Sequence, residues 1–214
     1  MLKRYLTVNE NGSNELNIQK SRFIGYIRRA ETEEDAIAFI DEIKKKHHDA
    51  THNCSAYMIG EHDNIQKAND DGEPSGTAGV PMLEVLKKQQ LKDTVVVVTR
   101  YFGGIKLGAG GLIRAYGKAT SQAIQATGVV ERILTDGFSI TVDYTLLGML
   151  ENEIRQSPHI LHAINYADDV EFIVYVETDE STAFKEWIVN LTSDNASIQP
   201  LDQKYIEKEV PSSH

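Results

Sequence analysis

The sequence contains a single cysteine, Cys54, in 214 residues, so no disulfide bond can form within one chain. It also lacks any apolar run near the roughly 18 residues that a membrane-spanning helix needs. The first residues, MLKRYLTVNENGSNELNI, have no apolar core of signal-peptide length. These absences argue against a disulfide-stabilised secreted protein and against a membrane protein, and we expect a cytoplasmic location.

Basic residues are scarce in the last third of the chain. Residues 135–214 carry 4 Lys and Arg against 15 Asp and Glu, a net charge of -11, whereas residues 1–134 carry 18 against 17, a net charge of +1. Such an asymmetry indicates two modules with different partners. Because acidic surfaces repel nucleic-acid phosphates, any site for a polyanion is expected in the first module, and a protein partner is the candidate for the second.

Hydrophobic periodicity predicts an α/β protein with two domains, residues 1–134 and 135–214. The clearest helix is 32–48, which has Thr32 as a cap, acids in its first turn and basic residues at its end. The second domain reads as a ferredoxin-like βαββαβ unit. Its predicted elements are a strand at 138–144, a helix at 145–157, strands at 160–167 and 170–177, a helix at 180–194 and a last strand after 196.

The stretch RYFGGIKLGAGGLIRAY, residues 100–116, is the first candidate site. It follows TVVVV (94–98), whose valines predict a strand buried on both faces. Glycines let backbone N–H groups approach a ligand, and a helix that begins near Gly110 adds the positive end of its dipole. The candidate anion- or nucleic-acid-binding residues are Arg100, Gly103, Gly104, Lys106, Gly108, Gly110, Gly111 and Arg114.

This glycine pattern matches neither the P-loop, which ends in Gly-Lys-Ser/Thr, nor the dinucleotide-binding fingerprint. Two structural alternatives therefore stay open. The glycines can simply let the helix pack tightly on the sheet, and one arginine can anchor a buried carboxylate such as Asp70 or Asp71.

The stretch DDGEPSGTAG, residues 70–79, is a second candidate loop. It offers acids beside a turn and hydroxyls at an expected helix start: Asp70, Asp71, Glu73, Ser75 and Thr77. One interpretation is a loop that faces the glycine-rich one and holds Mg²⁺ against a phosphate. The other is ordinary turn chemistry with a helix cap. The sequence predicts no catalytic residue and no metal-ligand set; Ser75, for example, lacks the G-x-S-x-G elbow.

Four motifs combine into a family pattern: KSRFI, HNCSAY, NDDGEPSGTAGVPML and VVVVTRYFGGIKLGAGGLIRAY occur in this order. Together they closely resemble the IMPACT family, also called uncharacterised protein family 0029 (UPF0029), in its bacterial two-domain form. The resemblance is motif-specific from about residue 18 to 128, and RYFGG followed by LG is intact. Residues from about 138 to 200 match the small C-terminal domain of that form only in pattern.

The resemblance implies an N-terminal domain like domain 2 of ribosomal protein S5 and a C-terminal domain like those of elongation factor G. Eukaryotic members act in translation regulation by binding a ribosome-associated coactivator of a stress kinase, without known catalysis. The implied function is therefore a non-catalytic regulator that binds RNA, the ribosome or a protein. The alternative is an enzyme or sensor for a small phosphorylated ligand, because the S5-like fold also houses small-molecule kinases; only this alternative needs Mg²⁺.

Overall fold

The computed structural model describes residues 1–211, which form two units. The N-terminal unit comprises Tyr5–Glu131 and the described residues from Lys208 onward, and the C-terminal unit comprises Met1–Arg4 and Arg132–Glu207. The predicted division between residues 134 and 135 therefore differs from the observed one. The first four residues belong to the C-terminal unit, and the residues from Lys208 onward belong to the N-terminal unit. The first residues belong with the C-terminal unit because Leu134 N donates to Lys3 O (2.9 Å) and Tyr205 Oη donates to Leu2 O (2.7 Å).

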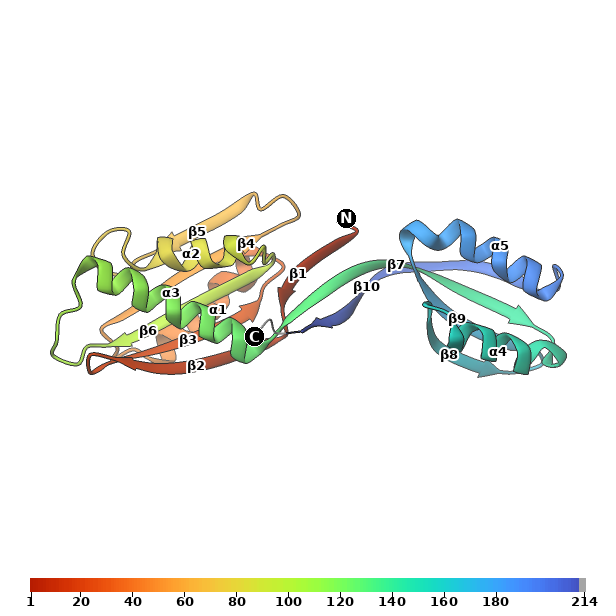
Figure 1. Ribbon diagram of the computed structural model, residues 1–214, viewed down its shortest axis with the longest axis horizontal. Coiled ribbons are helices and arrows are strands. Elements are labelled where there is room, and N and C mark those ends of the chain that lie inside the picture. Colours follow the sequence, from red (N-terminus) through yellow and green to blue (C-terminus); the bar gives the residue numbers. More distant parts are fainter. Residues whose placement is uncertain (212–214) are drawn as a thin grey trace. The chain divides into compact units, whose positions relative to one another are not determined.

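The N-terminal unit is built on a five-stranded sheet of order β2-β3-β6-β4-β5, whose neighbouring strands are all antiparallel. Helix α1 covers one face of this sheet, and α2 and α3 cover the other (Figure 1). The elements are β2 (Asn11–Ile18), β3 (Ser21–Arg29), α1 (Glu33–Lys46), β4 (His52–Ile59), β5 (Ile65–Asn69), α2 (Gly79–Lys88), β6 (Thr94–Tyr101) and α3 (Gly108–Thr127).

The valine strand β6 lies at the centre of this unit. All four valines, Val95 to Val98, are fully buried, which confirms the predicted burial on both faces. Val95 and Val97 pack in the core under α1, while Val96 and Val98 pack in the core under α2 and α3. Two-sided burial of this kind is usual in parallel sheets. Here it occurs in an antiparallel sheet because helices cover both faces.

The antiparallel order decides what surrounds the end of β6. Arg100 is registered against His52 at the start of β4, and Tyr101 against Arg22 at the start of β3. The glycine-rich loop consequently emerges between the beginnings of two neighbouring strands. Gly103 packs so closely there that a Cβ atom on it would lie 2.0 Å from the carbonyl carbon of Lys20.

The C-terminal unit shows the predicted order βαββαβ. Its elements are β7 (Val129–Val142), α4 (Leu147–Gln156), β8 (Ile160–Tyr166), β9 (Val170–Glu177), α5 (Ser181–Thr192) and β10 (Ser197–Val210). The sheet has the order β1-β7-β9-β8, with β10 also paired to β7. Of β1 (Arg4–Val8) only Arg4 belongs to this unit, and the first residues of β7 and the last residues of β10 belong to the N-terminal unit. Phe138, Phe172, Leu150 and Phe184 share its core, so α4 and α5 pack on one face of the sheet.

No helix within residues 1–211 is both long enough and apolar enough to cross a membrane.

Candidate functional site

The two predicted loops meet at a cavity of about 380 Å³ in the N-terminal unit. The acidic loop contributes Glu73 and Pro74, and the segment before β4 contributes Thr51 and His52. The rest of the wall comes from the end of β6, the glycine-rich loop and the start of α3: Arg100, Phe102, Lys106, Leu107, Gly108, Ala109 and Leu112. The antiparallel pairing of β4 with β6 places these segments side by side.

Glu73 is the centre of a buried polar network beside the cavity. Its Oε1 accepts hydrogen bonds from Arg100 Nη1 (2.7 Å) and from Tyr116 Oη (2.7 Å). The side chains of Arg100 and Glu73 are only 6% and 3% exposed, so each charge depends on the other for compensation. His52 completes the group, with Nε2 3.8 Å from Glu73 Oε2 and Nδ1 2.8 Å from the carbonyl oxygen of Asp71.

Arg100 is therefore held in place by structural partners. Its Nη2 also donates to Ser21 Oγ (3.4 Å), and its guanidinium carbon lies 5.5 Å from the centre of the Phe102 ring. One donor, Nε, is buried without a partner among the described residues. The alternative that an arginine anchors a buried carboxylate describes Arg100 well, but the carboxylate is that of Glu73 and not of Asp70 or Asp71. A direct contact of Arg100 with an anion stays a prediction.

Asp70 caps helix α2 from a distance in the chain. Its carboxylate accepts hydrogen bonds from the backbone N–H groups of Gly76 (2.8 Å), Ala78 (3.0 Å) and Gly79 (2.8 Å). Burial by itself raises the pKa of this carboxyl, but the three donors outweigh it and the pKa of Asp70 is lowered. The expected helix-start hydroxyls do not cap: Thr77 Oγ1 donates to Pro74 O (2.6 Å), and Ser75 is exposed.

The acids of this loop do not converge on a metal position. Asp71 accepts from the backbone N–H of Asn53 (2.7 Å) and pairs with Lys44 (3.0 Å), whereas Asp70 and Glu73 have the separate partners described above. Across residues 1–211, no group of three or more His, Cys, Asp or Glu side chains is placed to hold a metal ion. The interpretation of this loop as a Mg²⁺ ligand set is thus not supported, because each carboxylate is already engaged by a different structural donor.

The buried nucleophiles near the cavity are held in their protonated forms. Cys54 is fully buried, its Sγ donates to Asp70 O (3.0 Å), and burial raises the pKa of its thiol to about 12. Burial also raises the pKa of Tyr116, whose hydroxyl faces Glu73. Neither group ionises near neutral pH, which fits a role in packing and hydrogen bonding.

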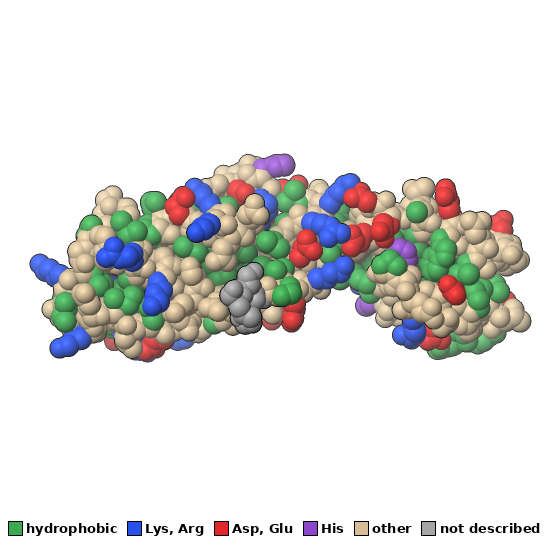
Figure 2. All heavy atoms as spheres, in the orientation of Figure 1, with side chains coloured by type: hydrophobic (Ala, Val, Ile, Leu, Met, Phe, Trp, Pro, Cys, Tyr) green, Lys and Arg blue, Asp and Glu red, His purple; other side chains and the backbone are tan. Residues whose placement is uncertain are grey.

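Exposed positive charge lies on and beside the glycine-rich loop, and Lys106 also lines the cavity. Lys20, Lys106 and Arg114 are exposed, and in the described part of the chain none has an acidic partner within ion-pair distance. We call Lys20, residues 102–111 and Arg114 the loop tip. Figure 2 shows Lys and Arg side chains projecting at the end of the N-terminal unit where Figure 1 places the loop between β6 and α3.

Backbone N–H groups at the start of α3 complete the loop tip. The helix begins at Gly108, two residues earlier than predicted, and has neither a side-chain cap nor an acid in its first turn. Gly104 and Gly108 have φ values of 85° and 68°, a conformation that favours glycine. Gly110 and Gly111 belong to the first turn of the helix, where they keep the backbone uncovered.

Sequence reasoning missed the apolar part of the loop tip. Phe102 and Ile105 are 47% and 41% exposed, although residues of these types are usually buried. Lys20 was also missed, because it joins the loop tip only through the close approach of Gly103 to the turn between β2 and β3. The aromatic inside RYFGG was the available signal for Phe102, since it stands next to two glycines at the end of a strand.

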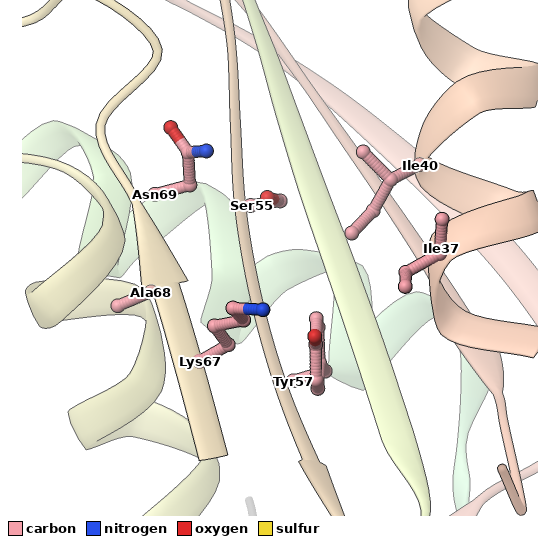
Figure 3. A pocket seen from close by; sticks show the side chains of 7 residues that line it. All are labelled: Ile37, Ile40, Ser55, Tyr57, Lys67, Ala68 and Asn69. Carbon is pink, nitrogen blue, oxygen red and sulfur yellow. The ribbon is translucent and has the colours of Figure 1, made fainter. Parts of the chain in front are cut away.

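A smaller hollow of about 200 Å³ lies between α1 and the β5 edge of the sheet (Figure 3). Ile37 and Ile40 reach from the helix toward Tyr57, and the cation at this hollow, Lys67, pairs with Glu33 at 3.6 Å. It therefore lacks the unpaired charge that distinguishes the loop tip.

Known proteins resemble this chain both in its separate domains and along almost its whole length. Residues 19–124 match the Impact N-terminal domain, and residues 140–195 match a domain of unknown function, DUF1949. The IMPACT family member YvyE of Bacillus subtilis is 59% identical over 98% of this chain and 97% of its own, and an IMPACT family member of Haemophilus influenzae is 38% identical over 88% and 92%. A crystal structure of a hypothetical protein is 27% identical, with a TM-score of 0.61 over 94% of this chain and 99% of that one.

Proposed function

The chain belongs to the IMPACT family, and from this membership we propose that its N-terminal unit is a non-catalytic RNA-binding module linked to translation. The contact surface is the loop tip. The observation that carries the proposal is a group of three exposed cations near the uncapped start of α3: Lys20, Lys106 and Arg114. None of the three pairs with an acid among residues 1–211.

Each component of the loop tip suits a phosphate backbone. Exposed lysine and arginine side chains neutralise phosphates and release their counterions, which gives affinity without a sequence requirement. Backbone N–H groups at a helix start add hydrogen-bond donors and the positive end of the dipole. An exposed aromatic such as Phe102 among cations is typical of surfaces that bind single-stranded nucleic acid.

The chemistry of the cavity favours binding over catalysis. Its buried carboxylate, Glu73, is engaged by Arg100 and Tyr116, and the nearby thiol of Cys54 has a raised pKa of about 12. A general base or nucleophile would need a pKa near the working pH and a free path to substrate.

Fluorescence anisotropy with a labelled single-stranded RNA, and cosedimentation with ribosomes, test the proposal. We expect binding that weakens steeply between about 50 and 200 mM salt. The double variant Lys106→Gln/Arg114→Gln should bind roughly tenfold or more weakly, with a salt slope shallower by about 1.4, because it loses two phosphate contacts to a single strand.

A matched control is Lys88→Gln/Lys185→Gln, which removes two exposed lysines from α2 and α5 while leaving the loop tip intact. It should bind RNA like the native chain. Absence of RNA and ribosome binding by the native protein at low salt, or equal loss in both double variants, would overturn the proposal.

A second candidate function is the binding of a small phosphorylated ligand in the 380 Å³ cavity, which Arg100, His52 and Lys106 line. A thermal-shift screen with nucleotides and sugar phosphates discriminates this candidate, because a ligand bound to the folded state raises the melting temperature by mass action. A specific shift with one small phosphate, together with no RNA binding, would favour it.

A further inference from the structure

We propose that the 380 Å³ cavity receives one unpaired nucleobase of the bound RNA, stacked against Phe102. This inference rests on the proposed function, since it assigns the part of the ligand that lies next to the phosphate. It identifies single-stranded RNA, and not a duplex, as the class of nucleic acid.

The cavity opens where the phosphates are expected. Lys106, Gly108 and Ala109 belong both to the loop tip and to the cavity wall. A phosphate held by Lys106 and the start of α3 therefore places an adjoining base at the mouth of the cavity. A base that enters must be unstacked and unpaired, as in single strands and loops.

The lining suits a flat amphipathic group better than a small anion. Four apolar side chains form much of the wall: Pro74, Phe102, Leu107 and Leu112. The deeper polar groups are Arg100 and Glu73, whose charges compensate each other at 2.7 Å. A bare phosphate placed there would face Glu73 as well as Arg100, whereas an uncharged ring can fill the apolar part without that repulsion.

Phe102 is positioned as a stacking platform before any ligand arrives. Phe102 is 47% exposed as a residue, and the Arg100 guanidinium carbon lies 5.5 Å from the centre of its ring. Its backbone N–H donates to Thr51 Oγ1 (3.1 Å), which fixes the start of the loop. A fixed aromatic costs little ordering entropy on binding, and stacking on it accepts any base.

The inner wall offers acceptors for the edge of a base. Glu73 Oε2 lies 3.8 Å from His52 Nε2, which is longer than a hydrogen bond, and both residues line the cavity. A base N–H can donate to this oxygen. Because each of the four bases carries an N–H on its pairing edge, the arrangement holds a base without selecting one.

Binding of a short oligouridylate, compared with an oligomer of the same length and backbone in which the bases are absent, tests the inference. The native chain should bind the base-free oligomer about tenfold more weakly. Phe102→Ala should bring the two affinities together, and Phe102→Tyr should restore the preference for bases. Ile37→Ala, which removes an exposed apolar side chain from the other hollow, is the matched control and should keep the native preference.

A second measurement does not depend on a loss of affinity. Trp187 is the chain's one tryptophan and lies in α5 of the C-terminal unit, so Phe102→Trp adds a separate fluorophore at the cavity. Oligouridylate should quench the added fluorescence, and the base-free oligomer should not. Ala109→Phe, which fills the mouth of the cavity from the first turn of α3, should abolish the preference for bases while leaving the salt slope unchanged.

The outcomes separate the two proposals. Equal, salt-dependent binding of both oligomers by the native chain would overturn the base site and leave the phosphate-binding loop tip standing. Binding of neither oligomer at low salt would overturn the proposed function and this inference together.

Discussion

The two units of the molecule cover their sheets differently. In the N-terminal unit helices lie on both faces, so every residue from Thr94 to Arg100 in β6 is buried. In the C-terminal unit α4 and α5 pack on one face, and β9 alternates between buried residues such as Phe172 and partly exposed ones such as Ile173. Full coverage lets the N-terminal unit bury an ion pair at the end of a central strand.

The two units also differ in net charge. Counted by structural unit, the N-terminal unit has 16 Lys and Arg against 18 Asp and Glu, a net -2, and the C-terminal unit has 6 against 14, a net -8. The difference is smaller than the +1 and -11 of the sequence-based division, because Lys3, Arg4 and Arg132 belong to the C-terminal unit. Polyanion binding by the N-terminal unit therefore depends on the local arrangement at the loop tip and not on its net charge.

The largest expected effect comes from the buried ion pair of the N-terminal unit. Glu73→Ala should lower its free energy of unfolding by about 3–5 kcal/mol, because it leaves the Arg100 charge buried without a partner. The matched change in the C-terminal unit is Glu151→Ala, which breaks an exposed pair with Arg155 and should cost at most about 0.5 kcal/mol.

Urea titration can follow the two units separately. Trp187 fluorescence reports the C-terminal unit, and hydrogen–deuterium exchange of β6 reports the N-terminal one. A small effect of Glu73→Ala on β6 exchange would show that the buried network contributes little to stability. It would contradict the expected difference between the buried pair and the exposed one.

Glycines give the next largest contrast. Gly103→Ala should destabilise the N-terminal unit by about 1–3 kcal/mol, because its Cβ would lie 2.0 Å from the backbone of Lys20 and the loop must move. Gly148→Ala, in helix α4 with open space around the new Cβ, should stabilise the C-terminal unit by about 0.5–1 kcal/mol. Opposite shifts of the two urea midpoints check this pair, and shifts of the same sign would contradict it.

The smallest expected effect is on pH dependence. Burial is the main cause that lowers the pKa of His159 in the C-terminal unit, where Glu180 and Glu177 partly oppose it. The unfolded chain, with a histidine pKa of about 6.5, then takes up the proton first as pH falls. Stability is fully present above that value and is lost as pH falls through the lower pKa of the folded state.

His159→Gln should flatten this acid-side loss in the C-terminal unit. The N-terminal unit should keep its own loss, because the pKa of His47 is lowered too, first by burial and then by Lys46 and Arg22. Urea midpoints at about pH 5 and pH 7.5 provide the measurement, and an unchanged slope for the Trp187 signal would assign the dependence to other groups.

The sequence was a good guide wherever local pattern decides structure. The valines of β6 predicted burial on both faces, and the periodicity after Gly128 predicted βαββαβ, since alternation and helical spacing are local properties. The motifs around RYFGG also identified the family. The cap of helix α2 was harder to predict from the sequence, because it is Asp70 and not a neighbouring Ser or Thr.

By itself, then, the sequence determined the elements, the α/β class, the family and the two candidate loops, one acidic and one rich in glycine. Only the tertiary structure decided which charges are free. It paired Arg100 with Glu73, left Lys106 and Arg114 without an acidic partner among residues 1–211, and brought Lys20 and Phe102 to the same surface. The physical reason is that an ion pair or a cavity joins residues far apart in the chain, and their distance is set by strand register and helix packing, which no local spacing encodes.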